Sequence, residues 1–191
     1  MHATRRRALQ TVAAAAVLPA LGGCVASEVA RFPTLASAVD AVRGVRDGGF
    51  RSTGAWPLAH VLEHAAQSVE YSMTGFPEPK SALFQATVGR AAFAVFDARG
   101  AMSHGLDEPI PGAPQMTLAL PQAADRLLAA LAAFEAWQGP IAPHFAYGAL
   151  AQAEATRAHL PHLPNHFQEA GRPDARRAPS APPAAAPAQH P

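Results

Sequence analysis

Apolar side chains recur every three to four positions through most of the chain, and this spacing places them on one face of an α-helix. Strands would instead show alternation of apolar and polar positions, and runs of β-branched residues are absent. Glycine or proline follows most of the periodic segments, as at the ends of many helices. The pattern predicts five helices, at residues 35–46, 57–73, 79–99, 121–137 and about 151–168.

The third predicted helix has an apolar stripe typical of an amphipathic helix. The stripe consists of Leu83, Phe84, Val88, Ala92, Val95 and Phe96. After it, residues 101–120 contain three prolines and lack helical periodicity, so we expect a long Pro-rich loop. Loops of this length in compact domains are usually functional or disordered. Five amphipathic helices with short connections elsewhere predict an all-α domain, a helical bundle, over residues 25–170.

Residues 1–24 have the order of a bacterial export signal. Basic residues 5–7 come first, an alanine-rich apolar run follows at 12–21, and Leu21-Gly22-Gly23-Cys24 is similar to a lipid-attachment site. The apolar run is shorter than the ~20 residues of a membrane-spanning helix. We therefore expect a twin-arginine-type signal and a lipid on Cys24, or cleavage nearby that leaves a free thiol. Either outcome predicts a protein of the periplasm or cell envelope.

The composition of the chain excludes several kinds of site and several classes of protein. Cys24 is the only cysteine, which excludes an intrachain disulfide, a CxxC redox pair, an iron–sulfur cluster and a thiolate-rich metal site. Residues 25–170 hold nine Lys and Arg against thirteen Asp and Glu, a net charge of −4, so we expect no nucleic-acid partner. Residues 171–191 are rich in Pro and Ala and predict a disordered tail. The GxSxG, P-loop and GxGxxG motifs are absent, which argues against lipases, nucleotide hydrolases and Rossmann dehydrogenases.

The chain has nine histidines, and two of the predicted helices carry histidines four residues apart. These pairs are His60 with His64 and His162 with His166. Residues at this spacing lie about 6 Å apart on one helical face. Such a pair, with a third imidazole from a facing helix, supplies three nitrogen ligands and leaves a coordination position open, as in catalytic metal sites.

The helical wheel distinguishes His60 from His64. His64 falls beside the apolar stripe that includes Val61, whereas His60 falls roughly opposite to it. We expect His64 to face inward as a ligand and His60 to lie at the surface or behind the ligands. The alternative is that the histidines are packed or solvated side chains without a metal. The loop residues His104 and His144 have no partner that the sequence identifies.

A longer pattern of motifs resembles a known family. The segment from Trp56 to Pro77 begins Trp-Pro-Leu-Ala-His-Val-Leu-Glu-His, and further matches lie in Phe84-Gln85, in residues 109–114 and 143–148, and in the last histidine cluster. Over residues 31–170 the chain is similar to the bacterial domain-of-unknown-function family fifteen sixty-nine, which belongs to the DinB-like superfamily.

The resemblance implies a DinB-like four-helix bundle in which His64, His162 and His166 bind a divalent metal, zinc or nickel. It also implies a possible homodimer, and some superfamily members use the metal to activate a small thiol for transfer or isomerisation. One departure concerns Pro161 and Pro164, because each proline removes a helical hydrogen bond and two together can unwind the helix that carries the ligand pair.

Three functions remain open. The first is a metal-dependent enzyme for transfer, isomerisation or hydrolysis of an unidentified small molecule, with the loop as a pocket wall and His104 or Asp107 assisting proton transfer. The second is a non-enzymatic envelope lipoprotein that binds a ligand or partner. The third is a structural metal that only stabilises the bundle. Export by the twin-arginine route fits the two functions that involve a metal, because this route transports domains that have already folded around a cofactor.

Overall fold

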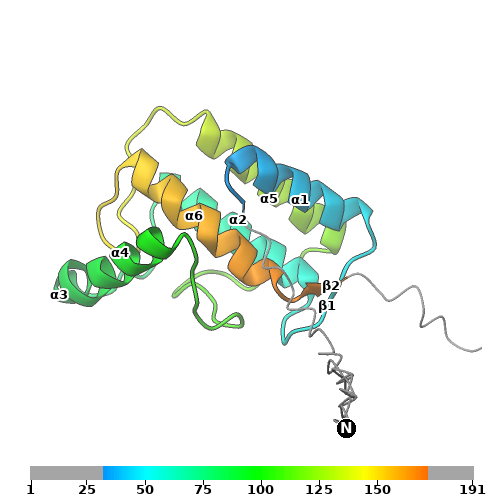
Figure 1. Cartoon of the computed structure of the whole chain (residues 1–191), viewed down its shortest axis with the longest axis horizontal. Coiled ribbons are helices and arrows are strands. Elements are labelled where there is room, and N and C mark those ends of the chain that lie inside the picture. Colours follow the sequence, from blue (N-terminus) through cyan, green and yellow to red (C-terminus); the bar gives the residue numbers. More distant parts are fainter. Residues whose placement is uncertain (1–31, 172–191) are drawn as a thin grey trace, which may run out of the picture.

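The computed structural model describes residues 32–171, and this part of the chain is mostly helical (Figure 1). The helices are α1 (Leu35–Asp47), α2 (Leu58–Thr74), α3 (Ala82–Phe84), the π-helical turn η1 (Gln85–Gly89), α4 (Arg90–Arg99), α5 (Leu120–Glu135) and α6 (Gln152–Phe167). Strands β1 (Arg51–Ser52) and β2 (Ala170–Gly171) pair antiparallel. The all-α prediction is confirmed. No helix among the described residues has both the length and the apolar character needed to cross a membrane.

Four long helices enclose the core. α2 packs against α5 and α6, and α1 packs against the same two helices, as their neighbouring positions in Figure 1 show. The largest fully buried apolar side chains are Val42, Val61, Leu62, Val69, Leu127, Leu131, Phe134 and Leu163. Each buried side chain of this size contributes about 1.5–3 kcal/mol, so this interface dominates the stability of the domain.

Local signals in the sequence set the helix ends. Thr34 caps α1, because its side chain accepts a hydrogen bond from the Ser37 N–H at 3.2 Å while the Ser37 side chain is hydrogen-bonded to the Thr34 N–H. At the start of α6, the Glu154 carboxylate accepts the Ala151 N–H at 2.8 Å. Gly100 ends α4 with a left-handed φ of 57°. The predicted bounds agree with the observed ones to within two residues, except that the third segment begins at Ala82 instead of residue 79.

The segment from α3 to α4 departs from its predicted stripe. Leu83, Val88 and Val95 are 74%, 57% and 45% exposed, and Phe93, outside the stripe, is the buried side chain of α4. After Leu83, the π-helical turn η1 adds a residue to the turn and shifts the phase of every following side chain, which accounts for the exposure of Val95 and the burial of Phe93.

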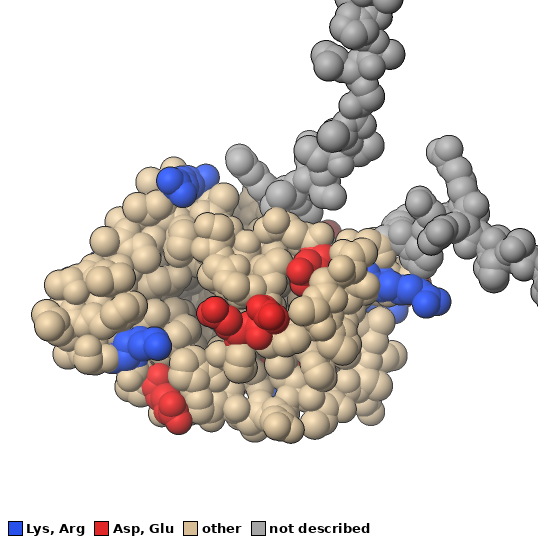
Figure 2. All heavy atoms as spheres, turned by 90° about the horizontal axis from the view of Figure 1, so that it is seen from below, with Lys and Arg blue, Asp and Glu red and all other residues tan. Residues whose placement is uncertain are grey.

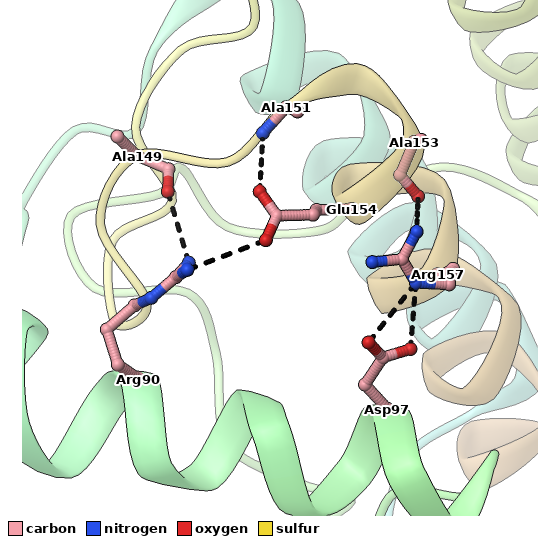
Figure 3. Close-up of polar contacts among 7 residues, drawn as sticks. All are labelled: Arg90, Asp97, Ala149, Ala151, Ala153, Glu154 and Arg157. Atoms are coloured by element: carbon pink, nitrogen blue, oxygen red, sulfur yellow. Dashed lines mark hydrogen bonds and ion pairs between the residues drawn. The ribbon is translucent and has the colours of Figure 1, made fainter.

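Ion pairs hold α4 against α6 (Figure 3). Arg157 Nε lies 2.9 Å from Asp97 Oδ1, and Arg90 Nη2 lies 3.5 Å from Glu154 Oε1. Arg90 also donates to the Ala149 carbonyl at 3.3 Å, just before α6 begins. These contacts hold α4 in place beside α6.

The two prolines do not unwind α6. The helix runs continuously from Gln152 to Phe167 with Pro161 and Pro164 inside it, and both prolines are buried. Packing of α6 against α2 and α1 holds the backbone helical despite the missing hydrogen bonds.

Residues 101–119 contain no helix or strand, and this loop lies below the helices in Figure 1. Its second half is fixed to α2, because Gln67 Nε2 donates to the Pro114 carbonyl at 3.1 Å and the Leu118 N–H donates to the Glu63 carboxylate at 2.8 Å. Glu63 and Glu70 both bind Arg126 of α5, so these carboxylates are occupied by structural contacts. The predicted signal at residues 1–24, with Cys24, and the tail from residue 172 lie outside the described residues.

Candidate metal centre

Three histidines from two helices meet in the core of the domain. His64 comes from α2, and His162 and His166 come from α6. The Nε2 atom of His162 lies 3.4 Å from that of His64 and 3.1 Å from that of His166. One ligand atom from each side chain lies within 4.8 Å of the other two. The structure therefore brings together the three residues that spacing and the helical wheel had selected.

Burial and neighbouring side chains limit the exposure of this cluster to solvent. His64, His162 and His166 are 4%, 9% and 1% exposed. The Trp56 ring stacks on His166 with a centroid distance of 6.5 Å and packs against His64 at 5.4 Å. His60 is only half-buried and takes no part in the cluster, as the wheel predicted.

The imidazoles are in the protonation state that a metal requires. Burial, together with the His104 charge, lowers the pKa of His64 to about 4. Burial, and the repulsion that a proton on His166 would meet from protonated His64 and His104, lower the pKa of His166 to about 2, while a backbone hydrogen bond of Leu106 has a smaller opposing effect. Burial and the neighbouring imidazoles also keep the pKa of His162 well below its usual value. All three are neutral at pH 7, and neutral imidazole nitrogen is a metal ligand.

The geometry fits a small divalent ion. Nitrogens bound tetrahedrally to zinc at 2.0–2.1 Å lie about 3.3–3.4 Å from one another, close to the two Nε2–Nε2 distances of this cluster. An imidazole pair at 3.1 Å also needs one donor and one acceptor, so three converging Nε2 atoms do not satisfy one another fully. The buried Nδ1 atoms of His64 and His166 have no hydrogen-bond partner within normal distance. The convergence of the Nε2 atoms is therefore costly without an ion between them, whereas the unpaired Nδ1 atoms remain so whether or not an ion is bound.

A fourth imidazole, from the loop, covers the cluster. The His104 ring centroid lies 5.2 Å from that of His162 and 4.8 Å from that of His166. No partner of His104 could be identified from the sequence, because helical periodicity carries no information about the path of a loop. Its proximity to the ligands emerges only from the tertiary structure.

The cluster opens onto a cavity of about 380 Å³. His64, His162 and His104 lie on its wall, and the loop supplies a further side through Met102 and residues 108–111. The other lining side chains are Ser68, Lys80, Phe84, His144, Phe145, Ala146, Tyr147, Ala158 and His159. The loop thus forms one wall as expected, but Asp107, the other residue considered for proton transfer, does not line the cavity.

The walls of the cavity are largely neutral. Burial lowers the pKa of His159 to about 4 and, together with the His159 charge, that of His144 to about 3. Burial raises the pKa of Tyr147 to about 12, so its hydroxyl keeps its proton. The charged lining groups are Lys80 and Glu108. Seen from the side of the loop, charged side chains are few; acidic groups lie near the middle and also at the lower left, where one adjoins a basic group, and Lys and Arg lie toward the edges (Figure 2).

His159 belongs to a different polar contact from the cluster. Its Nε2 atom lies 2.9 Å from Ser72 Oγ, which is also 3.1 Å from the Ser68 carbonyl. Both side chains are 3% exposed. The contact joins α6 to α2 one helical turn from the histidine cluster and satisfies two buried polar groups.

Comparison with known proteins identifies a family without an assigned activity. No curated protein and no solved structure gives a significant match to the chain. The family model described as "Protein of unknown function (DUF1569)" matches residues 26–172, which include every residue that the structure describes. Since this match spans most of the sequence, the chain belongs to the DUF1569 family.

Proposed function

We propose that this protein binds a divalent metal ion, zinc or nickel, through Nε2 of His64, His162 and His166 and uses it to transform a small molecule. The observation that carries the proposal is the convergence of three buried, neutral imidazoles beside a cavity of about 380 Å³. A metal bound there by three side chains has an unfilled position, which is typical of catalytic sites. Transfer, isomerisation and hydrolysis are the reaction classes that this arrangement suits.

The ion would supply Lewis acidity and would lower the pKa of a coordinated acid such as a thiol. The protein's own groups would orient the substrate. Tyr147 offers a hydroxyl donor, Lys80 offers a cation, and Phe84, Ile110 and Phe145 offer apolar surface. The Trp56 ring would keep water away from the opposite side of the ligands.

Metal analysis of full-length protein purified without a His-tag tests the proposal. After loading with zinc or nickel, the wild type should retain one ion per chain, and His162→Ala should lose it. His60→Ala is the matched control, because it removes a histidine from α2 that takes no part in the cluster, and it should retain the ion. Less than stoichiometric metal in the wild type, or metal unaffected by His162→Ala, contradicts the proposal.

We further propose that α1, α2, α5 and α6 form a DinB-like four-helix bundle and that the protein is exported. Residues 1–24 would act as a twin-arginine-type signal, and Cys24 would carry a lipid that anchors the domain in the cell envelope. Replacing Arg5 and Arg6 by Lys should trap the precursor in the cytoplasm, and Cys24→Ala should release the protein from the membrane fraction. Normal export of the first variant would argue against the twin-arginine route.

A further inference from the structure

His104 lies as close to the candidate ligands as these lie to one another. The ring centroids of His64, His162 and His166 are 4.6–5.3 Å apart, and His104 is 4.8 and 5.2 Å from two of them. Four imidazoles therefore form one group, of which three come from helices and one from the loop.

The orientation of His104 leaves a lone pair available. Its Nδ1 atom lies 2.6 Å from the Gly105 carbonyl, and since a carbonyl only accepts, Nδ1 carries the proton. In the neutral ring Nε2 is then the atom with the lone pair. An Nδ1–H bonded to a backbone carbonyl, with Nε2 left for the metal, is the usual arrangement of a ligand histidine. His104 has this arrangement, whereas the buried Nδ1 of His64 has no partner.

The His104 side chain can reach the other three imidazoles through a small movement of the loop. Its nitrogens do not belong to the group of ligand atoms that lie within 4.8 Å of one another. Among residues 32–171, no hydrogen bond joins residues 101–105 to a helix, whereas Pro114 and Leu118 are held by Gln67 and Glu63. Gly100 and Gly105 flank this stretch, and glycine accommodates changes of backbone angles.

We propose that His104 is a fourth metal ligand, supplied by the loop, which closes the metal site at rest and is displaced by an anionic ligand that enters the cavity. This inference rests on the proposed function. Four nitrogen ligands complete the tetrahedral shell of zinc, so the resting ion would be shielded from exchange. His104 also lines the cavity, so an incoming ligand would meet the metal at the position that His104 leaves.

Cobalt(II) titration of the full-length protein, read from its visible spectrum, tests the inference. The wild type should give the spectrum of a four-coordinate site. His104→Ala should still bind one ion, but roughly tenfold to hundredfold more weakly. A loss of this size is typical even when only a side chain that hydrogen-bonds a metal ligand is removed. X-ray absorption of the zinc-loaded proteins should count four imidazoles in the wild type and three in the variant. His104→Gln, which keeps a polar side chain of similar length, should reproduce His104→Ala.

Thiocyanate, added to the cobalt proteins, tests displacement. It should change the spectrum of His104→Ala at a lower concentration than that of the wild type, because no imidazole has to leave. Equal metal affinity, spectrum and thiocyanate response in wild type and both variants would overturn the fourth ligand and leave the three-histidine site intact. Failure of the wild type to bind cobalt and zinc would overturn both proposals, and His60→Ala controls for the loss of a histidine elsewhere.

Discussion

His144 shows how one side chain can determine both a turn and its response to pH. Its Nδ1 atom accepts hydrogen bonds from the backbone N–H groups of Ala146 and Tyr147, at 3.1 and 3.2 Å. The ring stacks on Tyr147 with a centroid distance of 4.2 Å and packs against Phe76 and Phe145. Protonation would turn the acceptor into a donor, so the turn requires the neutral ring.

This turn should make the domain sensitive to acid. The pKa of His144 is about 3 in the folded chain against 6.5 when unfolded, so between these values only the unfolded chain takes up the proton. Stability from this group is complete above pH 6.5 and is lost by up to about 1.4 kcal/mol per pH unit as the pH falls toward 3. His144→Asn keeps a short acceptor for the turn and does not titrate. Urea unfolding between pH 7 and 4 should give a shallower decline for this variant than for the wild type, and equal slopes would contradict the role of His144.

The convergence of the three candidate ligands was predictable from the sequence because helices convert residue spacing into geometry. Residues 162 and 166 share a face whenever the backbone between them is helical, and the wheel placed His64 on the buried side of α2. His104 could not be found in this way, since nothing local fixes where a residue of a 19-residue loop will lie. The partners of Glu63 were also not predictable from the sequence, because Leu118 and Arg126 lie far from Glu63 along the chain.

At the scale of elements, sequence periodicity located the long helices but predicted the wrong buried face for the α3–α4 segment. The phase of the α3–α4 segment changes at η1, where periodicity no longer applies. Gly89 ends this turn and packs directly on the backbone of Ala146. Only a residue without a Cβ permits that approach, and the approach places Ala146 and Tyr147 beside the cavity.

Two glycine substitutions should therefore have opposite effects. A Cβ at Gly89 would overlap the carbonyl of Ala146, so we expect Gly89→Ala to lower the free energy of unfolding by about 2 kcal/mol or more. Gly44, inside α1, has no atom within 4 Å of an added Cβ. Gly44→Ala should raise the free energy of unfolding by about 0.5–1 kcal/mol through its helix propensity. Chemical denaturation of both variants provides the measurement, and a stable Gly89→Ala would refute the close packing.

At the scale of the whole molecule, the candidate centre joins parts that lie far apart in the sequence. His64 is 98 residues from His162, and the loop between α4 and α5 covers the space where α2 and α6 meet. Without a metal, this junction buries imidazole nitrogens that have no hydrogen-bond partner, and each such group costs about 1–3 kcal/mol. A bound ion would leave those Nδ1 atoms unchanged, but it would accept the three crowded Nε2 lone pairs, which lie 3.1 and 3.4 Å apart and do not pair fully with one another, and it would connect α2 directly to α6.

Metal should therefore stabilise the whole domain and not only order its site. An ion that binds only the folded chain stabilises it by about 2.7 kcal/mol at a free concentration of a hundred times its Kd, which raises the Tm by roughly 10 °C for a domain of this size. Thermal unfolding of the wild type and of His60→Ala should show this increase with zinc, and a chelator should reverse it. His162→Ala should show none, because two imidazoles hold zinc too weakly. A similar increase in His162→Ala would mean that zinc stabilises the protein at some other position, and the three-histidine centre would then be wrong.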